Sequence, residues 1–404
     1  MKPRLLSWLF SACVLANLAA ATAPEGQYFI YVGSYTDAPS HSKGIYAWRF
    51  ETSSGKATPL GLVAETINPA YVCATPDGRF LYAVNWQTAE AAKGDTVSAF
   101  SINKKTGALT FLNKASAGGG LPNQVIVDPQ QEFVMVTNYG FHGNDAEHNN
   151  SSLAALPIQA DGSLGAPFYV DHHTGTALSP HQTTGAHTHG VIFTKDDRLA
   201  FVAELGLDRV YVYHVDAAKR GIRAADPPFV STNPGSGPRR LALSPDDKFL
   251  YVNHETDSKV SVFAIVRGTL KEIQQISTLP ADFTGRNTTA EIQLDQAGRF
   301  LYVSNRGANS IAIYAVDAGK GTLELREFVP SLGKSPRNIT IDPSGRYFFA
   351  ANQFSNNIVI FRRDPKTGEL TPTGQELQMD QPASVFLVRS AATNEAGDVR
   401  QTGN

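Results

Sequence analysis

The chain has 404 residues, a formal net charge of −2 and no long run of like charges, so it lacks the basic stripe of a nucleic-acid-binding protein. Its 34 glycines, 23 prolines and 10% aromatic residues are typical of short strands joined by many turns. It also lacks a G-x-S-x-G nucleophile elbow, a P-loop, a Rossmann fingerprint and a C-x-x-C-H haem motif. We therefore expect no nucleic-acid partner and no bound cofactor.

The first 23 residues have the pattern of a signal peptide. Lys2 and Arg4 give a positive start, residues 5–20 are mainly apolar, and A-T-A at 21–23 is a small-residue cleavage site. The apolar run is short for a membrane span, which needs about 20 residues. We expect an exported protein, periplasmic or secreted, whose mature form has no membrane span. An uncleaved N-terminal anchor is the alternative.

The two cysteines do not predict a disulfide. Cys13 lies in the predicted signal peptide, which leaves Cys73 alone in an apolar strand of the mature protein. We therefore expect Cys73 to be a small buried residue.

A repeat of about 50 residues dominates the rest of the chain, and a repeat of this length is typical of propeller blades. Each unit has a short strand, a turn resembling Pro-Asp-Gly, a second strand ending near Asn, a polar loop and a third strand of alternating polarity. Six units carry the strand–turn–strand element, at 72–86, 125–139, 191–205, 241–255, 292–306 and 339–353. Clear third strands follow at 209–215, 259–265, 310–316 and 357–363.

A seventh unit is divided between the two ends of the chain. Residues 28–32 and 44–50 match the second and third strands of a unit, and 382–388 match the missing first strand. Pairing of these ends would close the ring and protect its open edges. The sequence therefore predicts an all-β, seven-bladed propeller over 24–390, followed by a flexible tail at 391–404.

Comparing equivalent positions of the repeats separates scaffold from candidate site. Because each turn joins antiparallel strands, the start of the first strand and the end of the second lie at the same end of the hairpin. Just before the first strand stand Ala70, Asn123, His189, Arg239, Ala290, Arg337 and Ala383. At the end of the second strand stand Tyr35, Trp86, Tyr139, Leu205, Glu255, Arg306 and Gln353. The preceding position is Asn in four units, at 85, 138, 305 and 352, which favours a scaffold role.

Four charged or titratable residues fall on three adjacent blades at this end of the ring: His189, Arg239, Glu255 and Arg306. A base, an acid and two cations on one rim could recognise an anion and transfer a proton. The alternative is that they are solvated or paired surface charges. We expect the nearby His187, Tyr139, Arg337 and Gln353 to bind the substrate.

Histidines are dense between residues 172 and 189. The H-T-H sequence at 187–189 suggests a metal only weakly, because no carboxylate or cysteine lies at a recognisable ligand spacing. We expect no metal there. The segment 141–150 is polar and is expected to form a mobile loop over the same face.

Four stretches, 185–213, 235–263, 290–314 and 335–361, resemble the propeller lactonases, the family of 6-phosphogluconolactonases and carboxymuconate-lactonizing enzymes. The motifs that carry the resemblance are H-T-H-G at 187–190, G-P-R at 237–239, E-T-D-S-K-V at 255–260 and S-N-R-G at 304–307. The resemblance extends from about residue 28 to 388.

The resemblance implies that His189, Arg239, Glu255 and Arg306 are the catalytic residues, which are the four that the internal comparison selects. It implies hydrolysis of a sugar-type lactone or the related lactonizing cyclisation. The chain departs from the family pattern at Arg240, where His is common, and at His181-Gln182, where Arg-Gln is common. Both departures are expected near the anion pocket.

Two other functions fit the same fold. An exported propeller without enzyme activity could bind a glycan or a protein through this rim. A metal-dependent gluconolactonase-type propeller would hold its metal with carboxylates and Asn, whereas the four rim residues here include only one carboxylate.

Overall fold

The computed structural model describes residues 26–86, 95–140, 150–176 and 185–391. The predicted signal peptide at 1–23 and nearly all of the predicted tail at 391–404 lie outside these ranges. The described chain forms 28 strands and two short 3-10 helices, η1 (Ala217–Lys219) and η2 (Gln353–Ser355). No helix in these ranges is long and apolar enough to cross a membrane.

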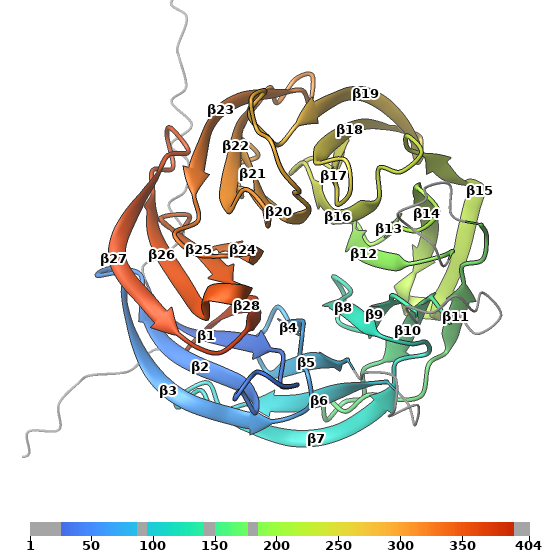
Figure 1. The fold of residues 1–404 in the computed structure, drawn as a ribbon. Coiled ribbons are helices and arrows are strands. Elements are labelled where there is room, and N and C mark those ends of the chain that lie inside the picture. Colours follow the sequence, from blue (N-terminus) through green and yellow to red (C-terminus); the bar gives the residue numbers. More distant parts are fainter. Residues whose placement is uncertain (1–25, 87–94, 141–149, 177–184, 392–404) are drawn as a thin grey trace, which may run out of the picture.

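The strands form seven four-stranded sheets, numbered here as blades 1 to 7 (Figure 1). Blade 1 contains β28 (Pro382–Arg389), β1 (Gln27–Ser34), β2 (Gly44–Glu51) and β3 (Lys56–Glu65). Blade 2 contains β4 (Val72–Ala74), β5 (Phe80–Asn85), β6 (Thr96–Ile102) and β7 (Leu109–Ser116). Blade 3 contains β8 (Pro122–Val127), β9 (Phe133–Asn138), β10 (Ser152–Pro157) and β11 (Tyr169–His172). Blade 4 contains β12 (Thr188–Phe193), β13 (Leu199–Glu204), β14 (Arg209–Asp216) and β15 (Gly221–Ser231).

The last three blades repeat the same order. Blade 5 contains β16 (Pro238–Leu243), β17 (Phe249–His254), β18 (Lys259–Val266) and β19 (Thr269–Ser277). Blade 6 contains β20 (Thr289–Leu294), β21 (Phe300–Asn305), β22 (Ser310–Val316) and β23 (Leu323–Pro330). Blade 7 contains β24 (Pro336–Ile341), β25 (Tyr347–Asn352), β26 (Asn357–Arg363) and β27 (Leu370–Gln378). The predicted seven-bladed, all-β propeller is confirmed.

The ring closes in blade 1, where the C-terminal strand β28 pairs antiparallel with the N-terminal strand β1. The ladder includes Phe29 opposite Val388 and Tyr31 opposite Phe386, and the two strands lie side by side in Figure 1. The predicted closure is therefore confirmed. It gives β1 a partner on each side and removes the open edge that unpaired strands would expose.

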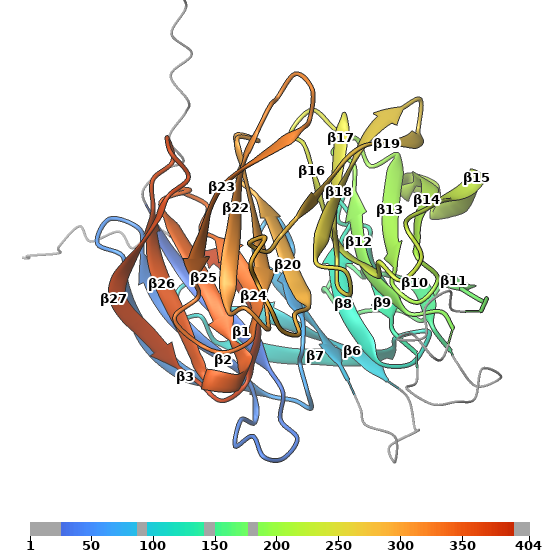
Figure 2. The same cartoon turned by 45° about the horizontal axis from the view of Figure 1, so that its top comes forward.

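The inner hairpins are closed by a polar side chain at the first position of their turns, which is Asp in three blades. Asp128, Asp295 and Asp342 each accept a hydrogen bond from the backbone N–H five residues later, at N···O distances of 2.6, 3.1 and 2.7 Å. These bonds close the turn between the first and second strands in blades 3, 6 and 7, and the hydroxyls of Thr75, Thr194 and Ser244 accept the equivalent bond in the remaining continuous blades. In the turned view of Figure 2 the hairpins stand along the ring axis, so each strand ends at one of two faces.

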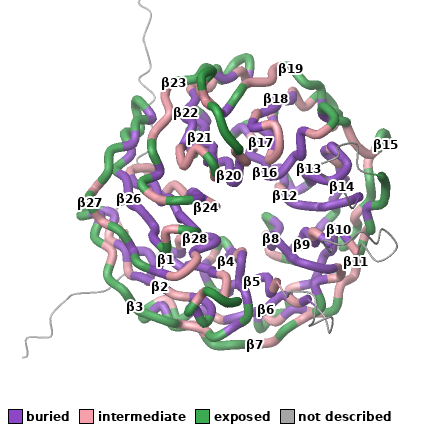
Figure 3. Tube along the Cα trace, in the orientation of Figure 1, coloured by how far each residue is buried: buried purple, intermediate pink, exposed green. Residues whose placement is uncertain are grey.

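Burial falls from the middle of each blade to its outside (Figure 3). The second strands β5, β9, β21 and β25 are buried along their whole length, whereas the outer strand β3 is mostly exposed. Cys73 lies buried in β4, as expected, and burial raises the pKa of its thiol. The core therefore consists of side chains packed between neighbouring sheets.

Candidate functional site

The first strand of a hairpin begins, and the second ends, at one face of the ring, which we call the site face. On this face, β12, β16 and β24 contain a bulge near their first residue. In β16, for example, Pro238 pairs with His254 and Arg240 with Asn253, so that Arg239 has no partner in the ladder. The corresponding bulged residues in β12 and β24 are His189 and Arg337.

The prediction that these residues come just before the first strand was therefore wrong by two positions, because each is the second residue of its strand. A bulge interrupts the alternation of side chains, which hides the start of the strand in the sequence. It also re-aims the bulged side chain. The strands β8 and β20 have the same irregularity, so the position is shared by five blades and only the identity of the residue marks a site.

Glu255 joins two of the predicted catalytic residues. Its Oε2 accepts a hydrogen bond from Nε of Arg239 at 2.6 Å, and its Oε1 lies 2.9 Å from an Nη of Arg306. Arg239 also donates to the carbonyl of Ala290, and Arg306 donates to that of Thr289 at 3.0 Å. One carboxylate thus holds two guanidinium groups from adjacent blades. We call these three residues the clamp.

The clamp keeps Glu255 ionised. Burial by itself raises the pKa of Glu255, but the positive charges of Arg306 and Arg239 outweigh it and bring the pKa down to about 2. A carboxylate of this kind is a poor proton acceptor near neutral pH. Its role is to orient and neutralise the arginines. Within the described chain, the buried Nε of Arg306 has no hydrogen-bond partner.

His189 has the properties of a neutral base. Its side chain is buried, and burial together with the charges of Arg239, Arg240 and Arg337 holds its pKa well below the ordinary value of 6.5. Its Nδ1 has no hydrogen-bond partner among the described residues. A neutral imidazole has one nitrogen with a free lone pair, so His189 can accept a proton near neutral pH.

An aromatic arc continues the site across blades 1 to 4. The ring of Tyr139 stacks on His187 with centroids 4.2 Å apart, and His187 Nδ1 lies 2.8 Å from the carbonyl oxygen of Tyr139. Trp86 is 6.3 Å from Tyr139 and 6.1 Å from Tyr35. Arg337 of blade 7 lies over the Tyr35 ring at 5.1 Å. Three of the predicted substrate-binding residues, Tyr139, His187 and Arg337, therefore belong to one continuous set of contacts.

Gln353 is the fourth predicted substrate-binding residue. It is buried at the start of η2, directly after β25, at the site face. No hydrogen bond or ring contact within the described residues joins its side chain to the other seven predicted site residues. It shares their face of the ring but not their network.

Arg240 was expected near the anion pocket, but its hydrogen bonds go to the backbone. It donates to the carbonyl of His189 at 2.8 Å and to that of Asn123 at 3.0 Å. Its Nε lies 3.8 Å from the buried carboxylate of Glu291, and its guanidinium lies over the Tyr71 ring at 4.8 Å. Arg240 therefore supports the bulge that carries His189. The other departure, His181-Gln182, falls outside the described residues, as does 141–149 of the predicted mobile loop.

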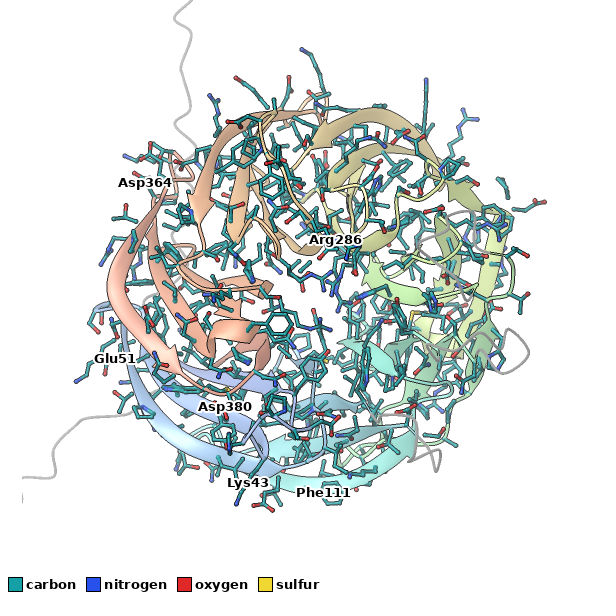
Figure 4. All side chains as sticks on the ribbon, in the orientation of Figure 1. Lys43, Glu51, Phe111, Arg286, Asp364 and Asp380 are labelled. Carbon is teal, nitrogen blue, oxygen red and sulfur yellow. The ribbon has the colours of Figure 1, made fainter. Side chains whose placement is uncertain are left out.

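The loop before β20 supplies a residue that the repeat comparison missed. Arg286 is exposed and lies at the inner side of the ring in Figure 4. The backbone carbonyl of Arg286 lies against Gly307, the residue that follows Arg306, so this loop adjoins the clamp. It precedes the repeated strand pattern, so comparison of strand positions could not select it.

The described residues contain no group of three or more His, Cys, Asp and Glu side chains that could hold a metal ion. A groove of about 680 Å³ lies elsewhere, at the opposite end of the blade 4 hairpin, where Asp196, Arg198 and Lys219 contribute to its lining. It includes none of the eight predicted site residues.

Residues 29–387 match the family described as lactonase, 7-bladed beta-propeller. A 6-phosphogluconolactonase of Bacillus subtilis is 34% identical over 362 residues, covering 89% of this chain and 98% of its own length. A 6-phosphogluconolactonase of Formosa agariphila is 32% identical over 361 residues, covering 89% of this chain and 99% of its own. The structure of a periplasmic gluconolactonase of Pseudomonas aeruginosa superposes with a TM-score of 0.83 at 33% identity, covering 91% of this chain and all of that one. The chain belongs to the seven-bladed lactonase family.

Proposed function

We propose that this protein hydrolyses a sugar-type lactone at the site face, with His189 as the general base and Arg239 and Arg306 as the groups that bind negative charge. The observation that carries the proposal is the clamp: two arginines fixed by one ionised carboxylate, next to a buried neutral histidine. Lactone opening needs these functions, an acceptor for a proton of water and cations for the developing oxyanion. Relatives named as gluconolactonases and 6-phosphogluconolactonases support it.

The steps follow from the roles of these groups. His189 removes a proton from water as the oxygen attacks the lactone carbonyl carbon. The carbonyl oxygen becomes an oxyanion, which the guanidinium groups of Arg239 and Arg306 stabilise. The ring C–O bond then breaks, and the leaving alkoxide takes the proton back from the His189 imidazolium. The product is the open-chain hydroxy acid, and Glu255 stays ionised throughout.

The remaining site residues suit a sugar. Aromatic faces pack well against the apolar C–H faces of a sugar ring, and Tyr139 and Trp86 offer such faces along the arc. Arg337 lies at the end of the arc and could bind a carboxylate or phosphate on the substrate. His187 stacks on one face of the Tyr139 ring and would hold that ring in place for the substrate.

The predicted signal peptide bears on the substrate. We propose that the mature protein is exported, with cleavage after residue 23. Phosphorylated sugar lactones are metabolites of the cytoplasm, so an exported enzyme would meet an aldonolactone without a phosphate. The relatives include both kinds in name, the 6-phosphogluconolactonases and the periplasmic gluconolactonase. We propose that the substrate of this chain is an aldonolactone without a phosphate, as the name of the periplasmic gluconolactonase suggests for that protein.

A lactone panel tests the proposal. Purified protein lacking residues 1–23 is assayed by pH-stat on glucono-δ-lactone, its 6-phosphate and a muconolactone, beside the His189→Ala/Arg306→Ala double variant. We expect turnover of glucono-δ-lactone that the double variant loses. Turnover of the muconolactone alone would favour the related cyclase chemistry. No turnover above the spontaneous rate on any lactone would overturn the proposal and favour a propeller that binds glycans or proteins.

A further inference from the structure

Four blades share one kind of side-chain hydrogen bond that joins each of them to the preceding blade. The last residue of the second strand is Asn in these blades, and its side-chain Nδ2 donates to a carbonyl in the segment arriving from the blade before. The pairs are Asn85 with Ile67 at 2.9 Å, Asn138 with Ala117 at 2.8 Å, Asn305 with Thr278 at 2.8 Å and Asn352 with Ser331 at 3.1 Å. This is a scaffold role, as the repetition in the sequence indicated.

Blade 4 departs from this rule, and it is the blade that carries His187 and His189. Its equivalent residue is Glu204, which is fully buried. The carboxylate oxygen Oε1 accepts hydrogen bonds from the backbone N–H groups of His187 and of Gly206, the latter at 3.2 Å. Glu204 therefore holds the backbone that leads into the bulge at His189 through a side-chain bond that none of the four Asn residues makes.

The other carboxylate oxygen of Glu204 binds two side chains. Oε2 accepts from the hydroxyl of Thr188 at 2.9 Å and lies 2.8 Å from Nδ1 of His173. The opposite ring nitrogen of His173 lies 2.7 Å from the Tyr213 hydroxyl, which donates to Asp171 at 2.8 Å. Glu204, His173, Thr188 and Tyr213 are all buried. A hydrogen-bonded chain thus runs from Asp171 on the outer strand β11 to the backbone before His189.

Four bonds fill the acceptor capacity of one carboxylate. An amide has only one oxygen, so Asn or Gln could accept at most two of the four. Asn is also one methylene shorter than Glu and cannot reach as far. This position in blade 4 thus requires an acceptor of a given reach, whereas the scaffold bond of the four Asn blades requires a donor.

We propose that Glu204, supported by His173, is a positioning residue of the active site: it fixes the backbone of His187 and Thr188 and thereby the place of the His187 and His189 rings. This inference rests on the proposed function for its effect on turnover. It also gives a role to one residue of the histidine-rich stretch, because His173 belongs to this hydrogen-bond network and lies outside the substrate site.

Two substitutions separate the effect of the length of the Glu204 side chain from the effect of its charge. Glu204→Gln keeps an oxygen at the same distance and loses the charge, whereas Glu204→Asp keeps the charge and withdraws it by one methylene. We expect Glu204→Asp to lower kcat on glucono-δ-lactone by roughly tenfold to a hundredfold, as small displacements of catalytic groups do, with KM within about twofold. Glu204→Gln should retain kcat within about threefold, because its oxygen can still accept from the N–H of His187.

Tyr82→Phe is the control for stability alone. Its hydroxyl donates to the carbonyl of Gly162 at 3.1 Å between blades 2 and 3. We expect this variant to lower Tm and leave kcat unchanged. If Glu204→Asp does not fold, Glu204→Asn replaces it, since Asn occupies this position in four other blades. A Glu204→Asp or Glu204→Asn protein with wild-type kcat would overturn the positioning role.

A second measurement does not depend on activity. Histidine side-chain NMR signals, assigned from the His187→Ala and His189→Ala spectra, report the surroundings of both rings. We expect both signals to shift in Glu204→Asp and to stay in place in Tyr82→Phe. Unshifted signals would contradict the inference. If the wild type turns over no lactone, the proposed function fails, while these spectra still decide whether Glu204 positions the two rings.

Discussion

At the scale of single residues, the site depends on how its charges are partnered. Glu255 lies between Arg239 and Arg306, and each oxygen of its carboxylate is bonded to one of the two guanidinium groups. His189 is surrounded by positive charge and stays neutral. By residue type alone, either His189 or Glu255 could be the base. These surroundings favour His189, since both carboxylate oxygens of Glu255 are bonded to guanidinium groups, whereas Nδ1 of His189 has no hydrogen-bond partner among the described residues.

Arg306→Ala should reduce kcat on glucono-δ-lactone by about a hundredfold, since removal of one oxyanion donor costs about 3 kcal/mol. The buried Nε of Arg306 without a partner and its contact with Glu255 are the basis of this expectation. The measurement is kcat by pH-stat. Arg326→Ala, which removes a half-exposed arginine from an outer strand, is the matched control and should match wild type. An unchanged kcat for Arg306→Ala would remove Arg306 from the mechanism.

The pH dependence of kcat/KM should reveal the base. His189 has a lowered pKa, so it loses its proton at a lower pH than an ordinary histidine. We expect kcat/KM to stay constant as the pH falls from about 8 and to decline only below the usual histidine range near 6.5. Glu255, with a pKa of about 2, would instead give a flat profile down to about pH 4. A decline that already begins at or above pH 6.5 would contradict the lowered pKa of His189.

At the scale of elements, the blades are joined by a repeated tyrosine–glycine contact. A tyrosine of the second strand donates its hydroxyl to a glycine carbonyl in the outer turn of the next blade. The pairs are Tyr31 with Gly107 at 2.9 Å, Tyr82 with Gly162 at 3.1 Å and Tyr302 with Gly368 at 2.7 Å. At these glycines a Cβ would meet a phenylalanine ring of the preceding blade, so no larger residue fits the contact.

Gly368→Ala should therefore destabilise the protein by about 3 kcal/mol, through its left-handed backbone and the crowding of Phe300. Its φ is +81°, and an added Cβ would lie 2.5 Å from that ring. Gly374→Ala is the matched control, because it has φ of +80° with no atom within 4 Å of the added Cβ. We expect it to cost only about 1 kcal/mol. Urea unfolding measures both, and equal losses would mean that the ring contact contributes nothing.

At the scale of the whole molecule, the ring is closed by contacts between the two ends of the described chain. The backbone N–H and the hydroxyl of Ser390, after β28, both donate to the carbonyl of Gln27 at the start of β1, each at 3.0 Å. The end of the last strand thus lies beside the beginning of the first. The inner strand of blade 1 is β28, which comes from the other end of the chain. Loss of β28 would open the ring and expose the unpaired edge of β1.

A circular permutant tests closure. Joining Arg389 to Gln27 through a short Gly/Ser linker and opening the chain at the exposed turn Arg267–Gly268 keeps every blade complete. We expect this permutant to fold with a cooperative thermal transition and wild-type kcat. A chain ending at Gln381, which lacks β28, should instead be recovered as aggregate. Soluble, cooperatively unfolding protein from the shortened chain would contradict the role of closure.

The sequence by itself determined the class of fold, the number of blades and the strand that closes the ring, because turn residues and alternating strands are local patterns that repeat. It also selected the positions of His189, Arg239, Glu255 and Arg306, since repeats show where side-chain identity departs from scaffold. Only the tertiary structure decided how these residues are partnered. Three features join segments from different strands or blades: the bulges, the bonds of Arg240 to backbone carbonyls and the link from Glu204 to His173. No local sequence pattern predicts which side chains meet at these places.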